Sequence, residues 1–166
     1  MPVRKFPSER SQSSLEFSGS AEAESKGERL VAYIDGGARG NPGEAGAGIY
    51  FERNGSPWRG LYRYLGRQTN NYAEYTALLE ALQYALKNGL ARIVVYADSE
   101  LLVKQMLGTY RVKHPVLQRL HEQAGQLARH FDSFAIHHVP RESNRKADSL
   151  ANKAQDLHSS GEESYC

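Results

Sequence analysis

The order of strand-like and helix-like segments constrains the fold of this 166-residue chain most strongly. Three strand patterns come first, and the second and third are joined by Asn54-Gly55, a dipeptide typical of a hairpin turn. Strands and amphipathic helices then alternate, as in sheets whose parallel strands are joined by helices. The expected strands are 29–35, 47–54, 58–66, 92–98 and 133–139, and the expected helices are 71–89, 99–107, 116–131 and 144–157. We predict an α/β fold in the order βββαβααβα, with helices flanking a five-stranded mixed sheet of three antiparallel strands followed by two parallel ones.

Composition separates one folded domain from two polar ends. Residues 1–29 hold seven Ser, five acids and five bases, too little apolar surface to offset the entropy of ordering. We expect a disordered tail at 1–29, a domain at 30–157 and a frayed C-terminus at 158–166. A tail that docks a partner is the alternative for 1–29.

Composition also excludes several classes of protein. Cys166 is the sole cysteine, which rules out a disulfide framework and a cysteine-based zinc site. No apolar run approaches the roughly 20 residues of a membrane span, and the N-terminus lacks the apolar core of a signal peptide. We expect a cytoplasmic protein without a membrane partner. The net charge of +2 does not by itself indicate a polyanion-binding protein.

Four acidic residues stand where apolar segments begin or end. Asp35 and Asp98 end the first and fourth strand patterns. Glu74 opens the apolar stripe of the first helix, and Asp148 lies in the early turns of the last one. Each acid also has an ordinary structural explanation. Asp35 could begin a turn, and Asp98 could cap the following helix. Glu74 could form a capping box with Asn71, and Asp148 could favour a helix N-terminus.

Asp35 and Asp98 are harder to explain as structural residues. Sites in open α/β sheets form at the carboxyl ends of strands, where both acids stand. If their strands are neighbours, the two carboxylates lie about 5 Å apart. Like charges at that separation raise each other's pKa unless a cation lies between them. Oxygen ligands without His or Cys favour Mg²⁺ or Mn²⁺ over zinc.

Four segments carry a resemblance to type 1 ribonuclease H. In chain order they are YIDGGARGNPGEAGAGIYFE, TNNYAEYTALLEAL, VVYADSELLVKQ and VPRESNRKADSLANKA. The second segment carries the motif T-N-N-x-x-E, the third D-S and the fourth N-x-x-A-D-x-L-A. The resemblance spans 30–157 and implies the ribonuclease H-like fold. It assigns four carboxylates as catalytic, metal-binding residues: Asp35, Glu74, Asp98 and Asp148.

The resemblance also implies a reaction, the endonucleolytic hydrolysis of the RNA strand of an RNA/DNA hybrid with two Mg²⁺ ions, for which Mn²⁺ is a possible substitute. One ion lowers the pKa of a bound water and the other stabilises the leaving 3′-oxygen, which leaves 5′-phosphate and 3′-hydroxyl ends. By resemblance, Asp35 bridges both ions, with Asp98 beside it. Glu74 holds one ion and faces the attacked strand, and Asp148 completes the other.

A hybrid is distinguished from DNA by its 2′-hydroxyls and groove shape. The resemblance assigns Asn41, Asn70 and Asn71 to sugars and base edges, and Arg67 and Thr69 to a DNA phosphate. Without the four acids, Asn70-Asn71 would be interpreted as an ordinary helix start and Asn41 as part of an ordinary turn.

Further substrate contacts are expected from glycine and histidine. Gly36 and Gly37 open a glycine-rich turn, 36–43, that would let the backbone approach the RNA closely. His114, in VKHP, lies near a position where relatives often carry Asn.

The chain departs from the family pattern in two places. Many relatives carry a histidine in the loop before the last helix, where it aids proton transfer or product release. Here that loop, 141–144, has no histidine, and Arg141 or Glu142 could take over this role. His137 and His138 precede this loop in a strand, where they point to opposite faces. The segment 108–115 is too short for the basic protrusion of many relatives, so we expect weaker hybrid affinity.

Three other functions stay open at this stage. The chain could be a nuclease of the same fold that acts on DNA, a non-catalytic nucleic-acid-binding module, or a structural domain whose acids are helix caps. We expect a monomer that binds RNA/DNA hybrids. Residues 30–157 hold 16 bases and 12 acids, so four acids in one metal site would leave a basic nucleic-acid face.

Overall fold

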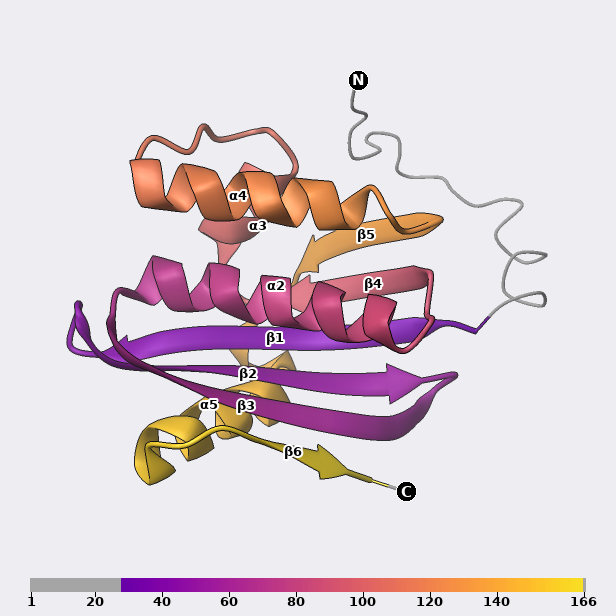
Figure 1. Ribbon diagram of the computed structural model, residues 1–166, viewed down its shortest axis with the longest axis horizontal. Coiled ribbons are helices and arrows are strands. Elements are labelled where there is room, and N and C mark those ends of the chain that lie inside the picture. Colours follow the sequence, from indigo (N-terminus) through magenta and orange to yellow (C-terminus); the bar gives the residue numbers. More distant parts are fainter. Residues whose placement is uncertain (1–27, 166) are drawn as a thin grey trace.

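The structure is a computed structural model that describes residues 28–165. Its strands are β1 (Leu30–Arg39), β2 (Gly43–Arg53), β3 (Ser56–Gln68), β4 (Arg92–Ala97), β5 (Ser133–His138) and β6 (Gly161–Ser164). Its helices are α2 (Asn70–Lys87), α3 (Glu100–Met106), α4 (Pro115–Ala128) and α5 (Arg145–Leu157), with a 3-10 turn η2 (Arg141–Ser143). The strands form one sheet in the order β5-β4-β1-β2-β3-β6 (Figure 1).

The pairing within the sheet confirms the predicted α/β fold. The β1–β2 and β2–β3 pairs are antiparallel, and the β1–β4 and β4–β5 pairs are parallel. The element order is the predicted one, with a sixth strand added at the C-terminus. The tail expected at 1–29 lies outside the described residues, apart from 28 and 29.

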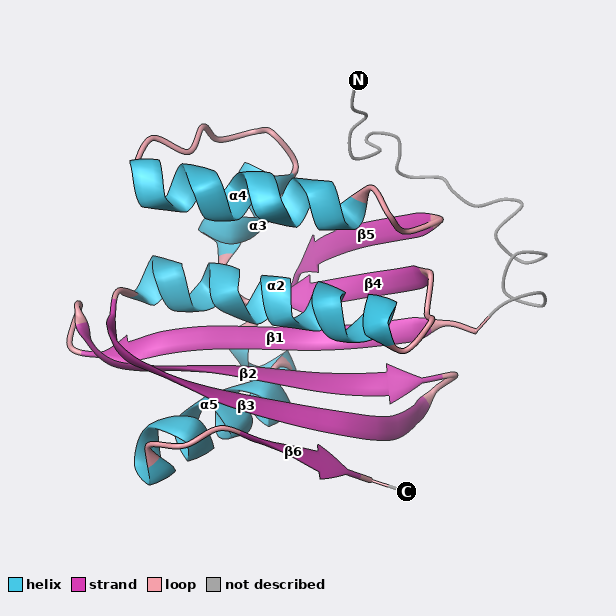
Figure 2. Cartoon of the chain, in the orientation of Figure 1, coloured by secondary structure: helices cyan, strands magenta, loops and turns pink. Residues whose placement is uncertain are grey.

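Helices cover both faces of the sheet. Figure 2 shows α2 and α4 on one face and α5 on the other. The predicted apolar stripe of α2 is buried against the sheet, with Ala77, Leu78, Ala81, Leu82 and Ala85 fully inaccessible to solvent. The main core therefore lies between α2 and the inner strands.

The first hairpin is longer than the sequence patterns predict. β1 continues to Arg39 and β2 begins at Gly43, so the expected turn at 36–46 shrinks to 40–42. Glycine and alanine give this stretch little apolar patterning, yet backbone pairing needs no side chains. The extension carries the Asn41 turn well beyond the end of β4.

The C-terminal segment corrects the expectation of five strands and a frayed end. β6 pairs antiparallel with β3, and the Tyr165 N–H donates to the Trp58 carbonyl at 3.0 Å. Glu162 and Glu163 form ion pairs with Arg59 and Lys153. A polar segment is therefore ordered by partners far away in sequence, which local composition cannot reveal.

Trp58 packs on the hairpin and on α2. Its ring centroid lies 5.9 Å from that of Phe51 and 5.7 Å from that of Tyr84 on α2.

Within residues 28–165, no helix has the length and apolar character that crossing a membrane requires.

Candidate active site

Parallel pairing of β1 with β4 brings the first two acids together. The register pairs Ile34 with Ala97, and Asp35 and Asp98 are the next residues along each chain. The two strands are therefore neighbours, which is the condition under which the two carboxylates were expected to lie close together. Asp35 does not end its strand, however, because β1 continues in order to pair with β2.

A close contact between β1 and α2 places Glu74. A Cβ atom on Gly36 would lie 2.3 Å from the carbonyl carbon of Ala73 and 2.6 Å from the amide nitrogen of Glu74. Glycine is needed for this approach, and the Gly36 N–H donates to the Glu74 carboxylate. The missing side chain thus lets α2 pack against β1, a role that the sequence did not indicate, and the expected approach of this backbone to RNA stays a prediction.

The start of α2 removes the ordinary explanation of Glu74. Thr69 is the N-cap, and its hydroxyl accepts a hydrogen bond from the Tyr72 N–H at 3.2 Å. Asn71 is the second residue of the helix, so the capping box with Asn71 as its N-cap is wrong.

The start of α3 likewise excludes the ordinary explanation of Asp98 as the cap of the helix that follows it. Ser99 is the N-cap, and its hydroxyl accepts from the Leu102 N–H at 3.2 Å. Asp98 uses its Oδ2 to accept from the Asn144 side chain at 3.1 Å. The carboxylate therefore faces the loop before α5 and does not cap α3.

Helix α5 brings the fourth acid to the same place. Gly48 is paired with Asp35, and a Cβ there would lie 2.2 Å from the Ala147 carbonyl oxygen. α5 can therefore lie directly against the hairpin backbone. Asp148, in its first turn, lies near enough to Asp35 that its side chain helps to raise the pKa of Asp35, although the group of oxygens within 4.8 Å of one another holds only Asp35, Glu74 and Asp98. This position also suits the helix N-terminus, as the ordinary explanation expects.

Burial and electrostatic repulsion together raise the pKa values of the clustered acids. Carboxylate oxygens of Asp35, Glu74 and Asp98 all lie within 4.8 Å of one another. Burial, followed by the charge of Asp98 and the contact with Asp148, raises the pKa of Asp35 to about 8. Burial and the charges of Asp35 and Asp98 likewise hold the pKa of Glu74 well above its usual range.

The donor set fits a divalent cation. Glu74 Oε1 is buried and has no hydrogen-bond partner within the described part of the chain. A buried carboxylate oxygen is costly to leave unpaired, and a bound cation would satisfy it. All the donors are oxygens, which Mg²⁺ and Mn²⁺ prefer.

Two of the three predicted asparagines join the hairpin to α2. The Asn70 side-chain oxygen accepts from the Ala38 N–H at 2.8 Å, and the Asn41 oxygen accepts from the Asn70 N–H at 3.0 Å. Their amide oxygens are thus committed to the backbone, and the NH₂ groups remain as donors. Gly37 lies close by, since a Cβ there would be 3.9 Å from the Asn70 oxygen. Asn71 is half-buried in the first turn of α2.

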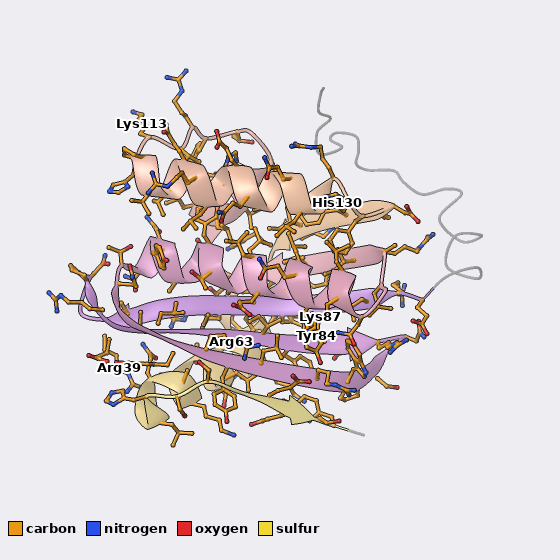
Figure 3. The ribbon with its side chains drawn as sticks, viewed as in Figure 1. Arg39, Arg63, Tyr84, Lys87, Lys113 and His130 are labelled. Atoms are coloured by element: carbon orange, nitrogen blue, oxygen red, sulfur yellow. The ribbon has the colours of Figure 1, made fainter. Side chains whose placement is uncertain are left out.

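Basic residues gather at the end of the molecule where α2 begins. Arg67 is exposed at the end of β3, two residues before Thr69. Figure 3 places Arg39 and Lys113 at this end and Lys87 at the other. Arg39 forms an ion pair with Asp156 at 2.8 Å.

The remaining predicted residues lie around this core. His114 is the N-cap of α4, where its Nδ1 accepts from the Val116 N–H at 3.2 Å, which gives it a structural role. Arg141 and Glu142 form the 3-10 turn next to the cluster. The Arg141 charge lowers the pKa values of Asp35 and Glu74, opposing the effect of burial.

His137 and His138 are both exposed on β5. The His137 ring lies 5.7 Å from the Tyr96 ring, and burial lowers its pKa.

Sequence reasoning missed Asn144. It is 1% exposed, and its side-chain NH₂ donates to the Ile34 carbonyl at 2.8 Å as well as to Asp98. The sequence shows it only as a loop asparagine before a helix, a common and uninformative position.

Comparisons with known proteins agree with this geometry. A reverse transcriptase-like family model matches residues 34–154. The chain is 42% identical over 132 residues to ribonuclease HI of Halobacterium salinarum, covering 79% of this chain and 66% of that protein. It is 42% identical over 130 residues to a bifunctional protein of Mycobacterium tuberculosis, covering 77% of this chain and 36% of that one. The chain thus spans less than two thirds of the length of these curated relatives.

Solved structures are also similar. The crystal structure of RNase H1 from Halobacterium salinarum matches with a TM-score of 0.76 and 42% identity, covering 78% of this chain and 98% of that one. LC11-RNase H1 in complex with an RNA/DNA hybrid matches with a TM-score of 0.73 and 38% identity, covering 78% of this chain and 98% of that one.

Proposed function

Since this chain belongs to the ribonuclease H family, we propose that it is a metal-dependent endonuclease that hydrolyses the RNA strand of RNA/DNA hybrids. The observation that carries the proposal is the packing of Asp35, Glu74 and Asp98 oxygens within 4.8 Å, beside which Asp148 helps to raise the pKa of Asp35. No cation of the described residues is ion-paired with any of these four acids. Divalent cations bound among these acids would neutralise their charges and so remove the repulsion between them.

The four acids would hold two Mg²⁺ ions, with Mn²⁺ as a substitute. When bound, such a pair of ions activates a water and stabilises the leaving oxygen of the phosphodiester. The pKa of Asp35 is raised by both Asp98 and Asp148, so Asp35 would be the best placed to serve both ions. Glu74, on α2, has a buried Oε1 without a hydrogen-bond partner among the described residues, and this oxygen would be a ligand of one ion.

The side chains beside the cluster would select the hybrid. Asn41 and Asn70 have their oxygens fixed by the backbone, so their NH₂ groups can donate to sugars and base edges. Asn71 and the backbone at Gly37 would complete this surface. These contacts would place the RNA strand over the acids.

The DNA strand would be gripped by a phosphate contact. Thr69 caps α2, whose N-terminal backbone N–H groups favour an anion, and Arg67 stands two residues away. Arg141 and Glu142 would act from the 3-10 turn, with Arg141 balancing part of the negative charge. We further propose a monomer that works in the cytoplasm.

Cleavage of a hybrid labelled at the 5′ end of its RNA strand tests the proposal. The full chain should cut the RNA only when Mg²⁺ or Mn²⁺ is present, and Asp35→Asn should not cut it. Asp132→Asn is a matched control, because Asp132 is exposed in the turn before β5. Unchanged cleavage by Asp35→Asn would remove the catalytic assignment. Cleavage of double-stranded DNA in preference to the hybrid would favour the DNA nuclease instead.

A further inference from the structure

Asn144 is the most deeply buried polar residue in contact with the acidic cluster. Its side chain is 1% exposed and lies between β1, β4 and the start of α5. One NH₂ group donates to the Ile34 carbonyl at 2.8 Å and to Asp98 Oδ2 at 3.1 Å. It therefore joins the residue before Asp35 to the acid that follows β4.

The side chain does not do what its position would suggest. Asn144 is the N-cap of α5, and an asparagine there commonly accepts a hydrogen bond from the helix backbone. Here it makes no such bond. It is turned inward instead, towards two acceptors at the cluster.

The main chain of Asn144 reaches a further acid. Its carbonyl accepts from the Asp148 N–H at 3.1 Å. A single residue thus contacts Asp98, the backbone next to Asp35 and the backbone of Asp148, which lie on three separate elements. These acids repel one another, so their relative positions need an external restraint.

We propose that Asn144 is a positioning residue, whose amide fixes the Asp98 carboxylate relative to Asp35 and thereby sets the metal affinity of the cluster. This inference rests on the proposed function, because it assumes that the acids hold metal. Both of its partners are acceptors, so the NH₂ group must face them. Its Oδ1 is then left buried, without a hydrogen-bond partner among the described residues. An unpaired buried oxygen is unfavourable, and it is tolerated where the orientation of the amide serves another purpose.

Two substitutions separate positioning from helix formation. Asn144→Ser keeps a residue that favours the N-cap but is too short to reach both acceptors, and Asn144→Ala removes every side-chain donor. Asn88→Ala is the matched control. Asn88 is the C-cap of α2, its side chain donates to the Tyr84 carbonyl at 2.9 Å, and it is exposed.

The experiment measures Mn²⁺ binding by the full chain without nucleic acid, using calorimetry and electron paramagnetic resonance well below each variant's melting temperature. Asn144→Ser and Asn144→Ala should bind Mn²⁺ about tenfold more weakly than the wild type, as for other residues that orient metal ligands. Asn88→Ala should bind it equally well. In the cleavage assay, kcat should fall while KM for the hybrid stays within about twofold, because Asn144 contacts the acids and not the substrate-facing asparagines.

The outcomes separate this inference from the proposed function. Folded Asn144→Ser with unchanged Mn²⁺ affinity would overturn it, because the amide would then have no effect on the acids. Failure of both variants to fold would also overturn it, since Asn144 would then anchor the whole domain. A wild-type chain that binds Mn²⁺ but cuts no hybrid removes the proposed function, while weaker binding by the variants would still support the role of Asn144.

Discussion

Two groups of acids in this molecule are arranged in opposite ways. On β6, Glu163 accepts from the Tyr165 hydroxyl at 2.9 Å and forms an ion pair with Lys153, and these contacts lower its pKa. Within β1, beside the end of β4, burial and neighbouring acids raise the pKa of Asp35 to about 8. The first arrangement stabilises the fold. The second destabilises it, which is reasonable only if the acids serve a cation.

The sharpest test of this contrast is the loss of one acid from each group. Asp35→Asn should lower hybrid cleavage by on the order of 1,000-fold or more, and it should raise the melting temperature of the metal-free chain by relieving repulsion. Cleavage kinetics and thermal unfolding in EDTA measure both effects. A lower melting temperature would show that Asp35 is structural.

The pH dependence of stability should reveal the same repulsion. Asp35 has a pKa of about 8 in the folded chain, against an ordinary pKa of 3.8, so between these two pH values the folded state binds more protons. Without metal, the free energy of unfolding should therefore fall as pH rises from about 4 to about 8, and Mg²⁺ should stabilise the chain more at pH 8 than at pH 5.

Thermal unfolding across this range, with EDTA or with Mg²⁺, checks the prediction. The slope is best taken as a difference from Asp35→Asn, because burial lowers the pKa of His137 and acts in the opposite direction. Equal slopes in the wild type and Asp35→Asn would contradict the assignment.

The end of the molecule where α2 begins and the opposite end should also differ in how much their basic residues contribute to hybrid binding. Arg67→Ala, exposed near the start of α2, should reduce the slope of log affinity against log salt for a hybrid by about 1, because its proposed phosphate contact is lost. Lys87→Ala, exposed at the opposite end, should leave the slope unchanged (Figure 3). Fluorescence anisotropy between low and moderate salt measures it. The wild-type slope should itself be shallower than in relatives with the basic protrusion, and equal slopes would refute the predicted weaker grip.

The smallest effect is expected on β6. Glu163→Gln should lower the free energy of unfolding by about 0.5 kcal/mol, since the ion pair with Lys153 is partly exposed. Cleavage should be unchanged. Chemical denaturation measures the difference, and a loss of activity in this variant would mean that the two groups of acids are coupled.

Much of the site could be predicted because its signals are local. Asp35 and Asp98 follow apolar strands, and parallel strands bring their carboxyl ends to one edge. Glu74 and Asp148 looked like helix acids from the sequence. Only the observed cap at Thr69, two residues before the expected Asn71, excludes the capping box for Glu74.

The parts that could not be predicted depend on distant contacts. β6 is a polar segment in sequence, and its glutamates form ion pairs that help to hold it in place. Arg59, on β3, lies far away in sequence, and Lys153 lies on the preceding helix, α5. Asn144 precedes a helix like many other asparagines, and its inward orientation follows from acceptors on β1 and β4. Neither the length of β1 nor the role of Gly36 has a local hydrophobic signature.

Gly36 and Gly48 lie at successive levels of the same hairpin and face its two opposite sides. At this point two helices are separated only by the thickness of a bare backbone. The distance between the two helices across the sheet is thus set by covalent geometry, which thermal motion changes little. We therefore expect the site to keep its dimensions up to the temperature at which the whole domain unfolds, so that inactivation by heat and global unfolding should coincide.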